Sequence, residues 1–96
     1  MVVGILRLEL FLPAPQSLKG KRALVQKILG RCRQRFSASC AETGAQDLWQ
    51  RTELGFAVVG SDEASLHTVF HHIEEEIDRI GVGDVTERYV EFLHFK

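Results

Sequence analysis

The sequence of 96 residues predicts a single α+β domain, in which two helices pack on one face of a four-stranded sheet. Four segments have the alternation or the apolar composition of strands, and two longer segments have apolar residues at helical spacing. These segments follow one another in the order strand, helix, strand, strand, helix, strand. Apolar residues make up 45% of the chain, which is typical of a globular protein and not of a disordered one.

The first strand is predicted over residues 2–12, where side chains alternate between an apolar side and a mixed side. The mixed side carries Arg7 and Glu9. Pro13 and Pro15 end the strand, because neither ring nitrogen can donate a hydrogen bond to a neighbouring strand. The apolar side consists of Val2, Leu6, Leu8, Leu10 and Leu12, and the mixed side also holds Val3, Ile5 and Phe11.

The first helix is predicted from the N-cap residue Ser17 to about Phe36. Its apolar residues form one stripe that can face the sheet, and a row of basic residues at i, i+4 spacing lies beside that stripe. The stripe consists of Val25, Ile28, Leu29, Cys32 and Phe36, with Leu24 on its flank. The basic row consists of Lys27, Arg31 and Arg35.

A hairpin is predicted to follow the first helix. We expect a short, weak strand at residues 37–42, a loop at 43–47 and a largely apolar strand at 54–60. Residues 47–51 are then part of the connection between the two strands.

The second helix is predicted to begin after Ser61 or Asp62 and to end at Gly81 and Gly83. A last strand at residues 85–95 carries apolar side chains on both faces. The buried stripe of the second helix consists of Leu66, Val69, Phe70, Ile73, Ile77 and Ile80.

This order of elements, with one apolar stripe on each helix, predicts the ferredoxin-like βαββαβ fold over residues 1–96. Both helices then cover one face of an antiparallel four-stranded sheet. The other face exposes Val3, Ile5, Phe11 and aromatic side chains of the last strand. Because an open apolar face is unfavourable in water, we expect a homodimer that buries it.

Charge is distributed unevenly between the two halves of the chain. Residues 1–51 contain nine basic and three acidic residues, a net +6, and residues 52–96 contain three basic and ten acidic residues, a net −7. This asymmetry predicts one basic and one acidic region, if the fold keeps the two halves apart. The alternative is that neighbouring elements neutralise each other.

The cellular compartment follows from three further features. No apolar run approaches the roughly 20 residues that span a bilayer, so we expect no membrane insertion. The N-terminus lacks a basic leader and reaches Arg7 and Glu9 too early for a secretory signal. Cys32 and Cys40 have no metal-binding or redox spacing, so we interpret them as free thiols in a reducing cytoplasm.

Several motifs resemble those of a known family. They are Ser-Leu-Lys-Gly-Lys-Arg at residues 17–22, Phe-Ser-Ala-Ser-Cys-Ala-Glu at 36–42 and Asp-Leu-Trp-Gln-Arg-Thr-Glu-Leu-Gly at 47–55, together with the opening residues 1–8. With these motifs the chain resembles the small bacterial YlxP-like proteins of the DUF503 family. The resemblance is close as far as Asp62 and holds only in pattern beyond it.

The resemblance implies a ferredoxin-like fold and a bacterial cytoplasmic protein. Genes of this family often lie among those for transcription and translation factors, which implies work on RNA or the ribosome. The family supplies no catalytic residues that can be transferred to this chain.

The strongest candidate site is the start of the first helix, where unpaired backbone N–H groups favour an anion. Lys19, Lys21 and Arg22 lie there and are expected to contact phosphates. The alternative is that Lys21 pairs with Glu42 or Glu53, while Lys19 and Arg22 are simply solvated.

The basic row of Lys27, Arg31 and Arg35 is the second candidate. Like charges at i, i+4 repel, so a nucleic-acid backbone would stabilise the row. An acidic neighbour on the second helix, such as Glu76, is the alternative.

Trp49 and Arg51 form the third candidate, because a tryptophan in a loop near an arginine can stack on a base or a partner's side chain. The alternative, which we favour, is that Trp49 closes one end of the core.

His67 and His71 lie one turn apart, but no acid lies between them as in a zinc protease motif, so we interpret them as part of a solvated face.

No arrangement of residues indicates catalysis, a cofactor or a metal. We therefore predict a non-enzymatic protein that contacts RNA or a ribosomal particle through its basic first helix. The alternative is a structural or regulatory homodimer that binds a protein partner through Trp49 and the open sheet face.

Overall fold

The computed structural model describes residues 1–96. Its elements follow the predicted order of strand, helix, strand, strand, helix and strand. They are β1 (Val2–Phe11), α1 (Leu18–Arg35), β2 (Ser39–Gly44), β3 (Arg51–Gly60), α2 (Glu63–Ile80) and β4 (Asp84–His94).

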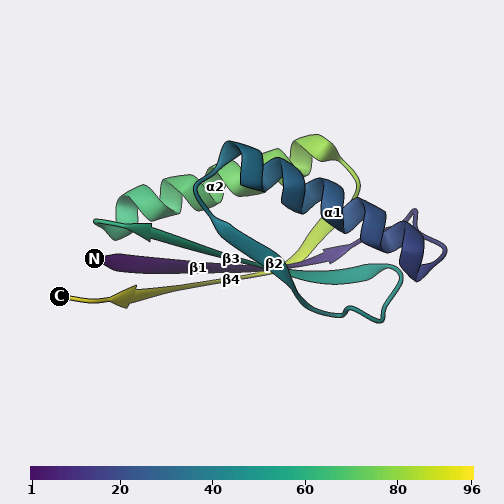
Figure 1. Cartoon of the computed structure of the whole chain (residues 1–96), viewed down its shortest axis with the longest axis horizontal. Coiled ribbons are helices and arrows are strands. Elements are labelled where there is room, and N and C mark those ends of the chain that lie inside the picture. Colours follow the sequence, from purple (N-terminus) through teal and green to yellow (C-terminus); the bar gives the residue numbers. More distant parts are fainter.

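The four strands form one antiparallel sheet in the order β2-β3-β1-β4. The central strand β1 pairs along its whole length with β3 on one side and β4 on the other. Both helices cover the same face of this sheet, and the opposite face carries no helix (Figure 1). The predicted ferredoxin-like fold is therefore confirmed. Neither helix has the length and apolar content needed to cross a membrane.

The core lies between the sheet and the two helices. The alternation predicted for β1 is confirmed, since Leu6, Leu8 and Leu10 are fully buried while Arg7 is exposed. The predicted apolar stripes of both helices pack against these side chains. The 17 apolar core residues are Val2, Leu6, Leu8, Leu10, Leu12, Val25, Ile28, Leu29, Cys32, Cys40, Leu54, Phe56, Val58, Leu66, Phe70, Ile73 and Ile77.

Helix α1 begins and ends where the sequence predicts. The Ser17 hydroxyl oxygen accepts a hydrogen bond from the Gly20 N–H at 3.1 Å, which satisfies one of the free donors of the first turn. At the other end, the Phe36 N–H donates to the Cys32 carbonyl. The helix carries seven lysines and arginines and no acidic residue, so any carboxylate that pairs with these cations belongs to another element.

Helix α2 is capped by Asp62, whose carboxylate accepts a hydrogen bond from the Ser65 N–H at 2.8 Å. That hydrogen bond lowers the pKa of the Asp62 carboxyl. Gly81 ends the helix in the left-handed conformation, with φ of 72°, which glycine adopts without steric cost. One residue of α2 departs from the predicted pattern, because the acidic side chain of Glu76 is buried with the apolar stripe.

The hairpin differs from the prediction in its boundaries. Strand β2 is shifted by two residues, and β3 begins at Arg51 and not at Leu54. Strand β2 extends to Gly44 because its pairing with β3 continues past a register shift to Glu53. Strand β3 begins at Arg51 because Arg51 and the buried Thr52 pair with β1. The predicted connection at residues 47–51 was wrong at one end, and Arg51 belongs to a strand.

Candidate nucleic-acid interface

The start of α1 contains a lysine that is part of the interior. Only 1% of the Lys21 side chain is exposed, and its ammonium nitrogen lies 2.7 Å from a carboxylate oxygen of Glu42. The same ammonium donates a hydrogen bond to the Ala45 carbonyl at 2.5 Å, and Glu42 also accepts one from the Thr52 hydroxyl at 2.6 Å. The expected phosphate contact of Lys21 was therefore wrong, and the alternative pairing with Glu42 is confirmed.

Lys19 and Arg22 remain exposed at this end of the helix, and neither forms an ion pair. The Gly20 N–H is already bound by the predicted N-cap residue Ser17, so it is not a free donor for an anion. Arg22 lies about 140° around the helix axis from Lys27, because five residues separate them. The helix start and the basic row therefore point to different sides of α1.

Three arginines surround one buried carboxylate where α1 meets α2. Arg31 and Arg35 of α1 each place a guanidinium nitrogen 3.3 Å from an oxygen of Glu76, and Arg79 of α2 donates to the same carboxylate. The Glu76 side chain is 1% exposed, whereas the three arginine side chains are 45%, 54% and 60% exposed. We call Arg31, Arg35 and Arg79 the arginine cluster.

The arginine cluster is not neutralised by the carboxylate that it surrounds. One negative charge on Glu76 faces three guanidiniums, which leaves an excess charge of +2. A buried carboxylate requires cationic or hydrogen-bonding partners, which explains why the arginines gather there. The predicted alternative for the basic row is thus confirmed for Arg31 and Arg35, although the pairing is incomplete.

A cavity of about 190 Å³ opens beside the arginine cluster. Arg35 and Phe36 line it from the end of α1, and α2 contributes His72, Glu75, Glu76 and Arg79.

Lys27 extends the same surface toward the start of α1. It lies four residues before Arg31, is exposed, and forms no ion pair. Arg33 lies on the other side of the helix, where it donates a hydrogen bond to the Cys40 carbonyl at 2.8 Å. We call Lys27 together with the arginine cluster the basic ridge.

The loop before β3 does not close the core. Trp49 is 54% exposed, so the interpretation that it seals one end of the interior was wrong. Arg51 pairs with Phe11 in the sheet register, which places both side chains on the face opposite the helices. The structure therefore separates Arg51 from the basic ridge.

The histidines and thiols are not gathered into a site. The His67 ring packs against Phe92 with 4.7 Å between the ring centroids, and His71 lies 3.7 Å from Glu75. No group of three histidine, cysteine or acidic side chains is placed to hold a metal ion. Burial raises the pKa of the Cys32 thiol to about 11, so this buried thiol is protonated at neutral pH.

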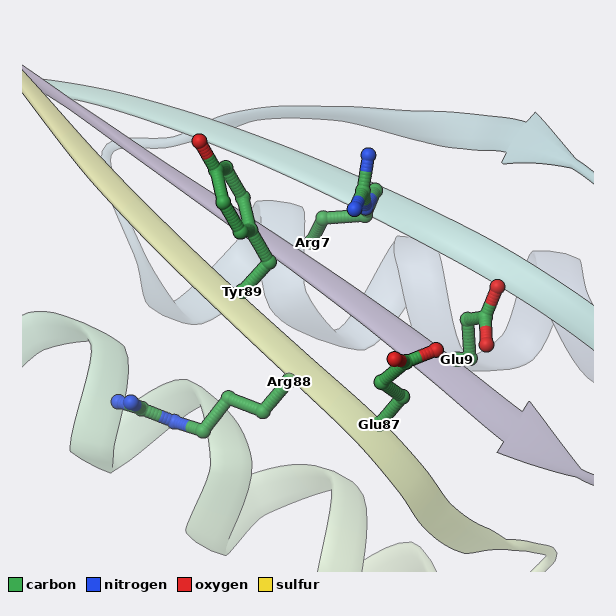
Figure 2. A pocket seen from close by; sticks show the side chains of 5 residues that line it. All are labelled: Arg7, Glu9, Glu87, Arg88 and Tyr89. Atoms are coloured by element: carbon green, nitrogen blue, oxygen red, sulfur yellow. The ribbon is translucent and has the colours of Figure 1, made fainter.

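The open face of the sheet has an apolar half and an acidic half. In the acidic half, Glu9 of β1 is the direct register partner of both Glu53 and Glu87. Glu87 raises the pKa of the Glu9 carboxyl, by a hydrogen bond and by like charge. Figure 2 shows Glu9 and Glu87 side by side, with Arg7 next to Tyr89; the Arg7 guanidinium lies 4.8 Å from the Tyr89 ring centroid.

Sequence comparison relates this arrangement to known proteins. The profile of a family described as "Protein of unknown function (DUF503)" matches residues 3–89. This chain belongs to the DUF503 family. The chain is also similar to "Uncharacterized protein YlxP" of Bacillus subtilis (strain 168), with 35% identity over 79 residues, which cover 82% of this chain and 78% of the relative. The predicted membership of this YlxP-like family is confirmed.

Two features of the site were missed by the sequence analysis. Arg79 joins the arginine cluster from α2, and the signal for it was Glu76, which lies between the buried residues Ile73 and Ile77. A carboxylate in an apolar stripe predicts nearby cations, and Arg79 is three residues away on the same helix. Glu9, Glu53 and Glu87 form an acidic row on the open face. No local pattern in the sequence indicates this acidic row, because only the strand register brings the three residues together.

Proposed function

We propose that this DUF503 protein is a non-enzymatic protein that binds RNA, free or within a ribosomal particle, through the basic ridge. The observation that carries the proposal is the charge ratio at Glu76, where three guanidiniums share one carboxylate. Cations of this kind bind phosphates, with release of counterions into solution.

The position of the basic ridge also supports the proposal. Its cations come from facing sides of two helices, and their side chains are about half exposed. Lys27, Arg31 and Arg35 are spaced roughly 6 Å apart along the helix axis, so they can meet successive phosphates of one strand. Lys21 is excluded from this surface by its burial.

The test is the affinity of a fluorescently labelled single-stranded RNA of about 20 nucleotides, measured by anisotropy at several salt concentrations. We expect Lys27→Gln/Arg31→Gln to weaken binding roughly tenfold and to lower the slope of log affinity against log salt by about 1.4, from about 0.7 for each phosphate contact. Glutamine is used because a new carboxylate at residue 31 would repel Glu76.

The matched control is Lys19→Gln/Arg22→Gln, which removes the same charge from the same helix on another side. Its affinity should stay close to that of the unmodified protein. Circular dichroism confirms that both variants fold. The proposal is wrong if the RNA does not bind at low salt, or if the two double variants lose affinity equally.

We propose a second candidate function, in which two copies associate through the open sheet face. The observation that favours it is self-complementary charge, because Arg7 lies beside the acidic row of Glu9, Glu53 and Glu87. A two-fold axis can place the Arg7 of each copy against the partner's acidic row. Exposed Val59 and Leu93 would then be buried in the apolar half.

Sedimentation equilibrium at tens of micromolar tests this association. We expect twice the monomer mass, and a return to monomer in Arg7→Glu. A monomeric unmodified protein contradicts the dimer, and a dimer that persists in Arg7→Glu contradicts this arrangement of it.

A further inference from the structure

We propose that the cavity beside the arginine cluster binds the terminal phosphate of an RNA strand, a phosphate monoester. This inference rests on the proposed function, since it names the group of the RNA that the cluster holds. The cavity, of about 190 Å³, lies between the end of α1 and the second half of α2.

The geometry of the donors carries the inference. The guanidiniums of Arg31, Arg35 and Arg79 converge on a single carboxylate, and two of these arginines, Arg35 and Arg79, line the cavity. Each guanidinium has five N–H donors, and Glu76 is contacted by one nitrogen of each. Donors therefore remain free on the exposed side of each arginine. A monoester presents three terminal oxygens to such a convergent set, and arginine binds phosphate oxygens in pairs.

The charge of the cavity also favours a terminal phosphate over an internal one. The arginine cluster exceeds Glu76 by two positive charges, and Glu75 at the cavity wall offsets one of them. Glu75 is itself 3.7 Å from His71, and His72 adds an imidazole to the wall. A phosphate monoester carries about −1.5 to −2 at pH 7, compared with −1 for an internal diester. Because the charge that remains at the cavity is positive, about +1, the monoester is attracted to it more strongly than a diester is.

Lys27 identifies the source of the monoester as a polynucleotide. It lies one helical turn beyond Arg31 and has no carboxylate partner. Lys27 lies about 12 Å from Arg35 along the helix axis, so a later phosphate of a strand whose end occupies the cavity can reach this ammonium. A free nucleotide or inorganic phosphate leaves Lys27 without a contact and is expected to bind more weakly.

Glu76 acts as a positioning residue in this arrangement. Its burial fixes the carboxylate, and the carboxylate in turn holds guanidiniums from two different helices toward one point. Without it, three like charges would repel one another and separate.

The experiment compares two labelled RNA 12-mers of the same sequence, one with a 5′-phosphate and one with a 5′-hydroxyl, with the label at the 3′ end. We expect the phosphorylated RNA to bind about tenfold more tightly, since charged hydrogen bonds are gained at the cavity. Arg79→Gln should abolish this preference. Arg35→Gln is the second variant, in case Arg79→Gln does not fold.

The control is Arg88→Gln, which removes an arginine that pairs with a single glutamate, Glu74. This variant should keep the preference for the phosphorylated RNA. Adenosine monophosphate and inorganic phosphate serve as competitors and should displace the RNA only at much higher concentrations.

The outcomes separate this inference from the proposed function. Equal affinity for the two RNAs, with binding that still depends on Lys27 and Arg31, overturns the terminal-phosphate site and leaves RNA binding intact. Failure of both RNAs to bind overturns both. If the mononucleotide competes as strongly as the phosphorylated RNA, the cavity is a nucleotide site and the assignment to an RNA end is wrong.

Discussion

Helix α1 places cations in two opposite electrostatic situations. Near its start, Lys21 is buried and meets one carboxylate, Glu42, with a backbone carbonyl as a further acceptor. Near its end, Arg31 and Arg35 are half exposed and share Glu76 with Arg79 of the second helix. The first arrangement is closed and neutral, whereas the second is open and carries excess positive charge.

Under the proposed function, an ion pair does not by itself prevent a cation from binding a ligand. What matters is how many cations share a carboxylate, and how much of each cation still faces water. Lys21 has a carboxylate to itself and is buried, which suits a structural role. The three arginines of the cluster share one carboxylate and remain about half exposed. This contrast separates the cation that stabilises the fold from those that we propose bind phosphate.

The largest effect is expected from breaking the closed pair. Lys21→Ala removes the cation that pairs with Glu42, whose side chain is only 16% exposed. Loss of one partner of a buried pair costs about 3–5 kcal/mol. The free energy of unfolding, measured by urea denaturation, should fall by this amount.

The matched control replaces both partners, as Lys21→Met/Glu42→Met. Since no charge is left unpaired, much of the lost stability should return. A cost for Lys21→Ala below about 1 kcal/mol, the range of exposed pairs, would show that the pair is not structural.

A smaller effect is expected from the carboxylate of the open arrangement. Glu76→Gln should lower the free energy of unfolding by roughly 1–3 kcal/mol, because it weakens the hydrogen bonds from Arg31 and Arg79 and the ion pair with Arg35. The cost is smaller than for Lys21→Ala because the arginines can turn to water. A larger loss than that of Lys21→Ala, measured in the same urea titration, would reverse the comparison.

The cap of α1 provides a third, weaker test. Ser17→Ala removes the acceptor for the Gly20 N–H and should cost about 1 kcal/mol of stability. Because the basic ridge lies elsewhere on the helix, RNA affinity should not change. A loss of RNA affinity in the folded Ser17→Ala variant would assign phosphate binding to the helix start.

The smallest effect concerns the acidic row on the open sheet face. Glu87 raises the pKa of the Glu9 carboxyl in the folded protein, so the folded state takes up a proton more readily than the unfolded chain. The stability contributed by this site therefore rises as pH falls through the raised pKa. Glu9→Gln should stabilise the protein at neutral pH and lose that advantage in acid. Thermal unfolding of both proteins from pH 7 to pH 4 checks this, and an advantage that grows in acid would contradict it.

Much of the fold could be predicted from the sequence because local patterns specify it. The strict alternation of β1, the cap at Ser17 and the apolar stripes of both helices are short-range signals, and the structure confirms each one. The hairpin was placed less accurately. The start of β3 at Arg51 depends on pairing with β1, which local composition does not reveal.

The site was predicted only in part, since its properties depend on contacts between elements. The sequence indicated that α1 is basic and that Lys21 and the basic row have possible acidic partners. It did not reveal that Lys21 is fully buried, or that Glu76 collects arginines from both helices. Those facts follow from the packing of α1 against α2 and the hairpin.

The most direct test of the account is the salt dependence of RNA affinity in Arg35→Gln/Arg79→Gln. In this variant Glu76 keeps one arginine, so the open arrangement becomes as balanced as the pair of Lys21 and Glu42. The slope of log affinity against log salt should fall by about 1.4 relative to the unmodified protein. An unchanged slope in the folded variant would show that the excess charge at Glu76 takes no part in binding.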